Sequence, residues 1–164
     1  MADSENNIEI QSKQGKIYGR GIFSIWILCG IALIVIDQIT KLLAVKSNFA
    51  ESLDRFGPYV GKTNFQNFKF AFSLPVPAIV MYVVYGIALT LVIRHMVIFW
   101  KNFNFMTRAA WVLILCGALS NIGERIALGY VRDFIYILTG IFNIADGFIL
   151  IGVILLLFSY QKDI

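Results

Sequence analysis

The feature that most constrains the fold is a series of four apolar runs, each long enough to cross a membrane as a helix. The runs cover about residues 22–45, 78–100, 107–128 and 141–160. A helix needs about 20 apolar residues to span the roughly 30 Å hydrocarbon core of a bilayer. The chain is 59% hydrophobic, well above the share of about 45–50% in soluble domains. We therefore predict an all-α membrane protein with four transmembrane helices, surrounded by membrane lipids.

Residues 1–20 differ from the rest of the chain, because they are polar, of mixed charge and without periodicity. This composition predicts a disordered tail, followed by one integral-membrane domain over residues 21–161. The first apolar run is too long for a secretory signal and no small-x-small cleavage site follows it, so we expect this helix to be retained. The net charge of +4 and the lack of a long basic run indicate contact with anionic lipid and no nucleic-acid binding.

The longest polar connection, residues 46–75, contains the alternating segment NFKFAFS at 67–73. Alternation places Phe68, Phe70 and Phe72 on one face, as in a strand. A strand with open edges is not stable inside the hydrocarbon. We therefore predict a small surface β-sheet between helices 1 and 2, with its aromatic face toward lipid.

Polar groups stand in the most apolar part of the chain, its last third. They are Asn121, Arg125, Asp133, Asn143 and Asp146. A polar or ionisable side chain at bilayer depth is costly, so it indicates a function and a partner nearby. On helices Asn121 and Arg125 share one face, as do Asn143 and Asp146. Asp133 lies between these pairs, and one long helix over 134–160, which would place Asp146 near mid-membrane, remains an alternative to a break at Gly140.

The first run contains an acid–base pair, Asp37 and Lys41, which has the favourable i,i+4 orientation. The pair begins about 23 Å from the entry end of the helix, near the far interface. Two interpretations are open. The pair marks a helix end with Lys41 extended to the headgroups, or it is an architectural part of a site.

With four spans, the costly polar groups fall at one leaflet. The first span ends with Asp37 and Lys41, the next connection contains Asn67, the third span ends with Asn121 and Arg125, the following segment contains Asp133, and the fourth span begins with Asn143 and Asp146. Asn67 is equally consistent with a turn. We infer a shared site in which Asp133 and Asp146 meet and work as an aspartyl dyad. His95 is the only histidine, which excludes a histidine triad or a multi-histidine metal site, and we expect no metal and no cofactor.

The distribution of basic residues gives a weak indication of topology. Lys and Arg number seven on the side of the termini and six on the other side. Leaving out Arg125, which we assign to the site, favours both termini inside, and therefore a site near the outer leaflet.

Five blocks of the sequence resemble, in order, those of bacterial lipoprotein signal peptidase, also called signal peptidase II. The blocks are DQITK (37–41), NFKFAFS (67–73), GALSNIGER (117–125), VRDFI (131–135) and FNIAD (142–146). The resemblance implies an aspartic endopeptidase of the bacterial cytoplasmic (inner) membrane. Its substrate would be a diacylglyceryl-modified prolipoprotein, cut just before the lipidated cysteine. It also implies that Asp133 and Asp146 are catalytic, and that the site is built or braced by Asp37, Lys41, Asn67, Asn121, Arg125 and Asn143.

The sequence departs from the family pattern at four positions. Lys69 and Phe70 replace the Gly and first Ala of Asn-x-Gly-Ala-Ala-Phe, Ser120 replaces Gly, and Glu124 replaces Asp. These changes bear on substrate preference and inhibitor fit. They also leave open a catalytically impaired homologue that binds lipoprotein signal peptides. A second alternative, based on the intramembrane acids, is a small proton- or ion-conducting protein, which predicts acids spread through the membrane depth. We expect a monomer.

Overall fold

The computed structural model describes residues 2–46, 54–55, 59–68 and 76–160. Its helices are α1 (Ala2–Lys46), α2 (Ala78–Phe99), the short η2 (Trp100–Asn102), α3 (Phe105–Leu128) and α4 (Ile144–Tyr160). Within this part of the chain, three segments are long and apolar enough to cross a membrane: Ser24–Lys46, Ala78–Asn102 and Phe105–Leu128. The apolar part of α4, Ile144–Ser159, is shorter. The predicted all-α membrane fold is confirmed, and its fourth helix begins at Ile144 rather than at residue 141.

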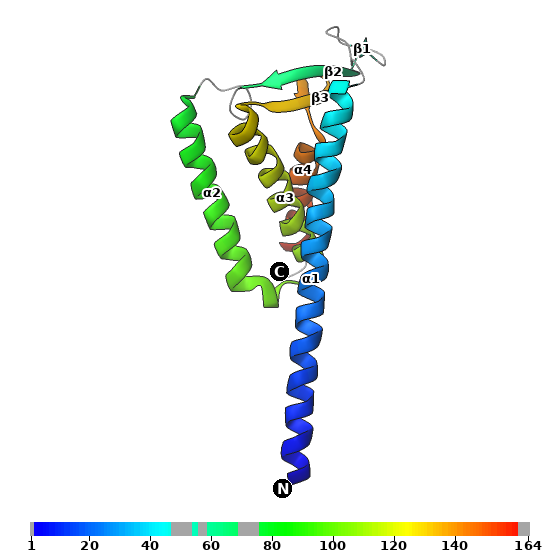
Figure 1. Cartoon of the computed structure of the whole chain (residues 1–164), viewed down its shortest axis with the longest axis vertical. Coiled ribbons are helices and arrows are strands. Elements are labelled where there is room, and N and C mark those ends of the chain that lie inside the picture. Colours follow the sequence, from blue (N-terminus) through cyan, green and yellow to red (C-terminus); the bar gives the residue numbers. More distant parts are fainter. Residues whose placement is uncertain (1, 47–53, 56–58, 69–75, 161–164) are drawn as a thin grey trace.

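The N-terminal part of α1 differs from the prediction. Residues 1–20 were expected to be a disordered tail, whereas the helix begins at Ala2 and extends beyond the bundle (Figure 1). Extending an existing helix adds a hydrogen bond for each residue without a new nucleation step. Proline does not occur between Ala2 and Lys46, so the helix of the first span can continue into the polar residues.

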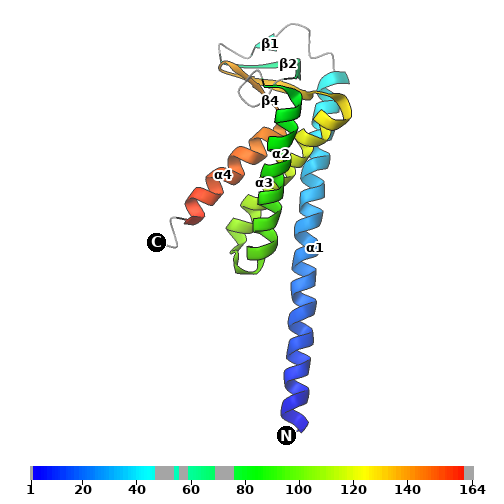
Figure 2. The same ribbon diagram turned by 90° about the vertical axis from the view of Figure 1, so that its left-hand side faces the viewer.

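A small antiparallel sheet covers one end of the helices (Figures 1 and 2). Its order is β1 (Asp54–Arg55), β2 (Val60–Asn67), β3 (Val131–Ile137) and β4 (Gly140–Phe142). The sheet was predicted between helices 1 and 2 alone, but β3 and β4 come from the connection between α3 and α4. The pairing of β2 with β3 satisfies backbone groups that a strand from one connection would leave open. The strands also exclude the alternative of one long helix over 134–160.

The strand predicted at 67–73 shares only Asn67 with the strand β2 that the structure describes. Strand β2 ends at Asn67, and residues 69–73 lie outside the described residues. Phe68 follows the strand, with its ring centroid 5.2 Å from that of Tyr130. Pairing of Asn67 with Val131 in the register of β2 and β3 fixes the end of β2 beside the start of β3. Backbone pairing with β3 sets the end of β2, and the alternating Phe70 and Phe72 lie outside the described residues.

Close packing of α3 against α4 positions the start of α4. A Cβ atom on Gly117 would lie 2.5 Å from the carbonyl oxygen of Ala145, and one on Gly152 would lie 2.7 Å from that of Ala110. Both alanines are fully buried. Glycine at these two positions lets the backbones approach as larger residues would not. At the sheet end, Gly129 closes α3 with a φ of 83°, and the chain turns back into β3.

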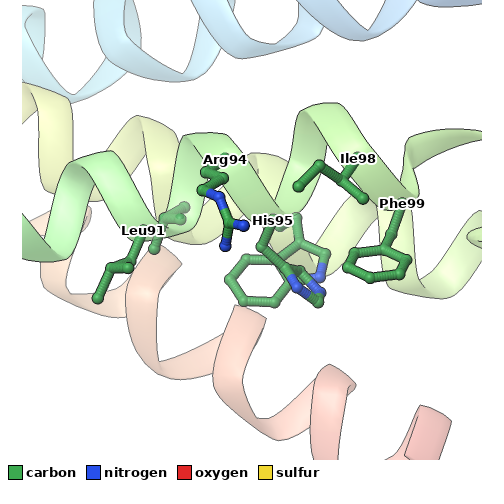
Figure 3. A pocket seen from close by; sticks show the side chains of 7 residues that line it. Leu91, Arg94, His95, Ile98 and Phe99 are labelled. Carbon is green, nitrogen blue, oxygen red and sulfur yellow. The ribbon is translucent and has the colours of Figure 1, made fainter.

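A hollow of about 340 Å³ lies beside the C-terminal part of α2. Its lining is Leu91, Val92, Arg94, His95, Ile98, Phe99 and Trp111 (Figure 3). The His95 ring centroid lies 4.9 to 5.5 Å from those of Phe99, Phe103 and Trp111. Most of its lining belongs to the C-terminal half of α2, and this end of α2 lies away from the sheet (Figure 1). The hollow shares no lining residue with the polar site predicted from the sequence.

Candidate active site

Charged and polar side chains are buried together at the sheet end of the bundle. Those at most 8% exposed are Asp37, Lys41, Ser120, Asn121, Glu124, Arg125, Asp133 and Asn143. They come from α1, α3, β3 and the residue before α4. Burial of such groups is costly unless each has a partner. The contacts described below provide these partners.

Asn143 and Asp146 form a capping box at the start of α4. The Asn143 Oδ1 accepts a hydrogen bond of 3.0 Å from the backbone N–H of Asp146. In return, the backbone N–H of Asn143 donates to Asp146 Oδ2 at 3.1 Å. This reciprocal pair satisfies two backbone donors at the helix N-terminus and fixes the carboxyl group of Asp146 there.

Asp133 lies on β3 and is held by two asparagines. Its Oδ1 accepts from Asn143 Nδ2 at 2.6 Å, and its Oδ2 accepts from Asn67 Nδ2 at 2.9 Å. Burial raises the pKa of Asp133 to about 6, opposed by the two amide donors and reinforced by the charge of Asp146. Asn143 therefore contacts both aspartates, and the residues predicted as a dyad are brought to the same asparagine.

Lys41 connects α1 to α3 at the centre of the cluster. Its Nζ lies 2.8 Å from Asp37 Oδ2, 2.8 Å from Asn121 Oδ1 and 3.0 Å from Glu124 Oε2. These three acceptors match the three donors of an ammonium group. Because Lys41 is fully buried, it does not extend to the headgroups as a helix-end lysine would. With its oxygen bound to Lys41, Asn121 donates from Nδ2 to Asp146 Oδ1 at 2.8 Å.

Asp37 joins the first helix to the last. Its Oδ1 accepts from the backbone N–H of Ala145 at 2.9 Å, and its Oδ2 accepts from Ser120 Oγ at 2.6 Å. A carboxylate at a helix N-terminus is stabilised by the free N–H groups there. Asp37 thus caps α4 from α1, in keeping with the architectural interpretation of the Asp37–Lys41 pair.

Arg125 is placed on the side of α3 that faces α2. Its guanidinium carbon lies 5.3 Å from the ring centroid of Tyr85, and its backbone oxygen accepts from the Tyr82 hydroxyl at 2.9 Å. Arg125 therefore joins α3 to α2, whereas the other predicted site residues contact one another. Its assignment as a brace of the dyad stays a prediction.

Four members of the network were missing from the predicted site. Arg132 binds Glu124 through its side chain, and its Nη2 donates to Gln38 Oε1 at 3.0 Å. Gln38 in turn donates to Ser120 Oγ at 2.9 Å. Ser120 and Glu124 were noted only as departures from a family pattern. The available signal was that Glu124 and Arg132 are charged residues inside the otherwise apolar last third.

A helical membrane protein with two linked carboxyl groups beneath a small sheet has the parts of a membrane-embedded peptidase. Comparison with known proteins identifies the family. A model described as "Signal peptidase (SPase) II" matches residues 29–162. The chain belongs to the signal peptidase II family, which confirms the resemblance seen in the sequence and makes the protein a peptidase.

Relatives and solved structures agree with this assignment. A lipoprotein signal peptidase from Caldicellulosiruptor bescii is 34% identical over 139 residues, covering 84% of this chain and 91% of the relative. One from Acinetobacter baylyi is 38% identical over 144 residues, covering 81% and 79%. A solved bacterial membrane enzyme, 26% identical, matches with a TM-score of 0.71 and covers 85% of this chain and 89% of its own.

Proposed function

We propose that Asp133 and Asp146 are the catalytic dyad of an aspartic endopeptidase. Its substrate is a prolipoprotein whose cysteine carries a diacylglyceryl group, and cleavage releases the signal peptide just before that cysteine. The observation that supports this most directly is the hydrogen bonding of Asn143 to both aspartates. Membership of the signal peptidase II family supports the reaction and the class of substrate.

The mechanism follows from two carboxyl groups that share one proton, since both cannot ionise cheaply when close together. The helix N-terminus and the Asn121 amide favour Asp146 as the charged member. Asp146 takes a proton from a water whose oxygen attacks the scissile carbonyl carbon, while Asp133 protonates the carbonyl oxygen. Collapse of the tetrahedral intermediate breaks the C–N bond. Asp146 gives its proton to the leaving amine, and Asp133 takes back the proton from the former carbonyl oxygen, which restores the starting state of the dyad. These steps need no metal and no covalent intermediate.

The position of the dyad suits a lipid-bearing substrate. The helices expose large apolar side chains along their length, so they lie in lipid and acyl chains can approach sideways through the bilayer. The sheet lies across the same end of the bundle as the dyad (Figure 1). An extended peptide near the headgroups would therefore meet the sheet and the two carboxyl groups together.

The topology we propose has both termini inside the bacterial cytoplasmic membrane and the dyad near the outer leaflet. The N-terminal end of α1 lies at the opposite end of the molecule from the sheet (Figures 1 and 2). The Lys and Arg count favours the termini as the inner side. Each protomer supplies both aspartates, so we propose that a monomer is active.

The test is cleavage of a diacylglyceryl-modified precursor by purified protein in liposomes. We expect Asp133→Asn and Asp146→Asn each to abolish turnover, by at least about 10³-fold, because each removes an essential carboxyl group. Asp163→Asn is the matched acid-to-amide control outside the predicted domain and should stay active. Cleavage by either dyad variant would overturn the assignment, and binding of the precursor without turnover by the unchanged protein would identify an impaired homologue.

A further inference from the structure

We propose that Glu124 and Arg132 form a positioning pair of opposite charges. The pair fixes β3, which carries Asp133, relative to Lys41 and Asn121, which hold Asp146. This inference rests on the proposed function. It assigns a role to two residues that contact neither aspartate directly. Both lie in the buried network, and the mechanism above does not use them.

The first step of the argument is the attachment of β3 to α3. Arg132 Nε and Nη2 both contact Glu124 Oε1. The backbone N–H of Arg132 also donates to Glu124 Oε2 at 3.1 Å. Glu124 thus holds both the side chain and the backbone of the residue immediately before Asp133. Paired contacts of this kind restrict orientation as well as distance.

The second step is the connection from Glu124 to the other aspartate. The Glu124 Oε2 that binds the Arg132 backbone lies 3.0 Å from Lys41 Nζ. Lys41 holds the Asn121 oxygen at 2.8 Å, and the Asn121 amide donates to Asp146 at 2.8 Å. A continuous series of hydrogen bonds and ion pairs therefore runs from the backbone next to Asp133 to the carboxyl group of Asp146.

The third step is the charge of the cluster. Asp37 and Glu124 bring two negative charges, and Lys41 and Arg132 bring two positive charges, all in contact as ion pairs or hydrogen bonds. Within these four groups the charge of Lys41 is therefore balanced, and the buried Arg125, which faces α2, carries a further positive charge at this end of the bundle. Loss of the Arg132 charge leaves one excess negative charge, and loss of the Glu124 charge leaves one excess positive charge. These changes act on the shared proton of the dyad with opposite signs.

Ionisable groups other than the pair also lie on the elements around the dyad, among the described residues. They are Asp37 and Lys41 on α1, Lys62 on β2, Tyr82 and Tyr85 on α2, Arg125 on α3, and Tyr136 on β3. Of these, Lys41 and Asp37 act electrostatically on the dyad, and Tyr85 interacts with Asp146 and Arg125. Neutral replacement of Glu124 or Arg132 leaves all the others in place. A difference between the two variants therefore reports the pair itself.

The experiment compares the pH dependence of kcat/KM for Arg132→Gln, Glu124→Gln and the double variant in liposomes. We expect the alkaline limb of Arg132→Gln to move up by about half a unit to one unit and that of Glu124→Gln to move down by a similar amount. In the double variant the alkaline limb should return to its position in the unsubstituted protein, and kcat should be about tenfold lower because β3 is no longer held. Arg132→Lys, which keeps the charge but not the paired contacts, should lower kcat with an unmoved limb.

Arg94→Gln is the control for loss of a cation far from the site, and its limb should not move. Shifts of the same sign in both single variants, or no shift in either, would overturn the proposal. Loss of the folded protein in all of the Glu124 and Arg132 variants would overturn it as well, because the pair would then serve folding alone. An inactive unchanged protein would instead overturn the proposed function, so the two failures are distinguishable.

Discussion

Asn143 holds Asp146 by two reciprocal hydrogen bonds, of 3.0 Å and 3.1 Å, while its side-chain amide donates to Asp133. One residue therefore caps α4 and joins the two carboxyl groups. This double role gives the first of five predictions, since the two functions of Asn143 are separable by substitution.

Asn143→Ser keeps a side-chain oxygen that can cap the helix but removes the donor to Asp133. We expect the thermal unfolding temperature to stay near that of the unchanged protein while kcat/KM falls by about 10²-fold. Asn143→Ala should lose activity and also about 1 kcal/mol of stability, because the cap is lost. Full activity of the serine variant would show that the amide contact with Asp133 is dispensable.

The pH dependence of activity should report the protonation of Asp133. Burial raises its pKa to about 6, and the hydrogen bond from Asn67 lowers it by favouring the ionised form. Activity that needs protonated Asp133 is therefore lost as pH rises through about 6. Asn67→Ala removes a donor to the anion, raises this pKa and moves the alkaline limb of kcat/KM upward. Gln66→Ala, the exposed neighbour on β2, is the control, and a downward shift for Asn67→Ala would contradict the assignment.

Removal of the Lys41 charge should destabilise the fold. Lys41→Met leaves the buried carboxylates of Asp37 and Glu124 without their shared cation. Breaking a buried ion pair in this way costs about 3–5 kcal/mol. Thermal unfolding in detergent measures this, with Lys101→Met in η2, which follows α2, as the control at an exposed lysine. Equal unfolding temperatures for the two variants would count against a structural role for Lys41.

Two glycines on α3 offer a matched test of the contact between α3 and α4. A Cβ on Gly117 would lie 2.5 Å from the Ala145 carbonyl oxygen, whereas a Cβ on Gly123 meets nothing within 4 Å. Gly117→Ala should lower the unfolding temperature and displace the start of α4, with loss of activity. Gly123→Ala should be neutral or slightly stabilising, because alanine favours a helix over glycine by about 1 kcal/mol. If both variants behave alike, the close approach of α3 and α4 is not important.

The carboxyl mechanism predicts that activity is independent of metal ions. Incubation with a chelator should leave cleavage of the lipidated precursor unchanged, because the proton transfers use only the two aspartates and water. A metallopeptidase treated in parallel serves as the positive control. Activity lost on chelation and restored by added zinc would point to a metal site instead.

The positions of the polar groups along the membrane normal could be predicted from the sequence, but most of the contacts between them could not. Apolar runs determine the membrane depth of each residue, so the placement of Asp37, Asn121 and Asp146 at one end of the bundle followed from chain order. Strand β3 was missed because its pairing with β2 is non-local, with Phe65 opposite Asp133. The Glu124–Arg132 contact was missed because it depends on how a strand docks against a helix, which residue spacing does not determine.

The bond between Asp37 and the Ala145 N–H has a consequence for biosynthesis. The acid belongs to α1 and its partner to α4, so the ribosome delivers the acid well before its partner. Until α3 is made, Asp37 and Lys41 have only each other for compensation, and Ser120, Asn121 and Glu124 become available as partners with α3. The bond that joins Asp37 to α4 therefore forms only after α4 has been made, and a chain stopped before α4 would lack this link between its first helix and the start of the dyad's last helix.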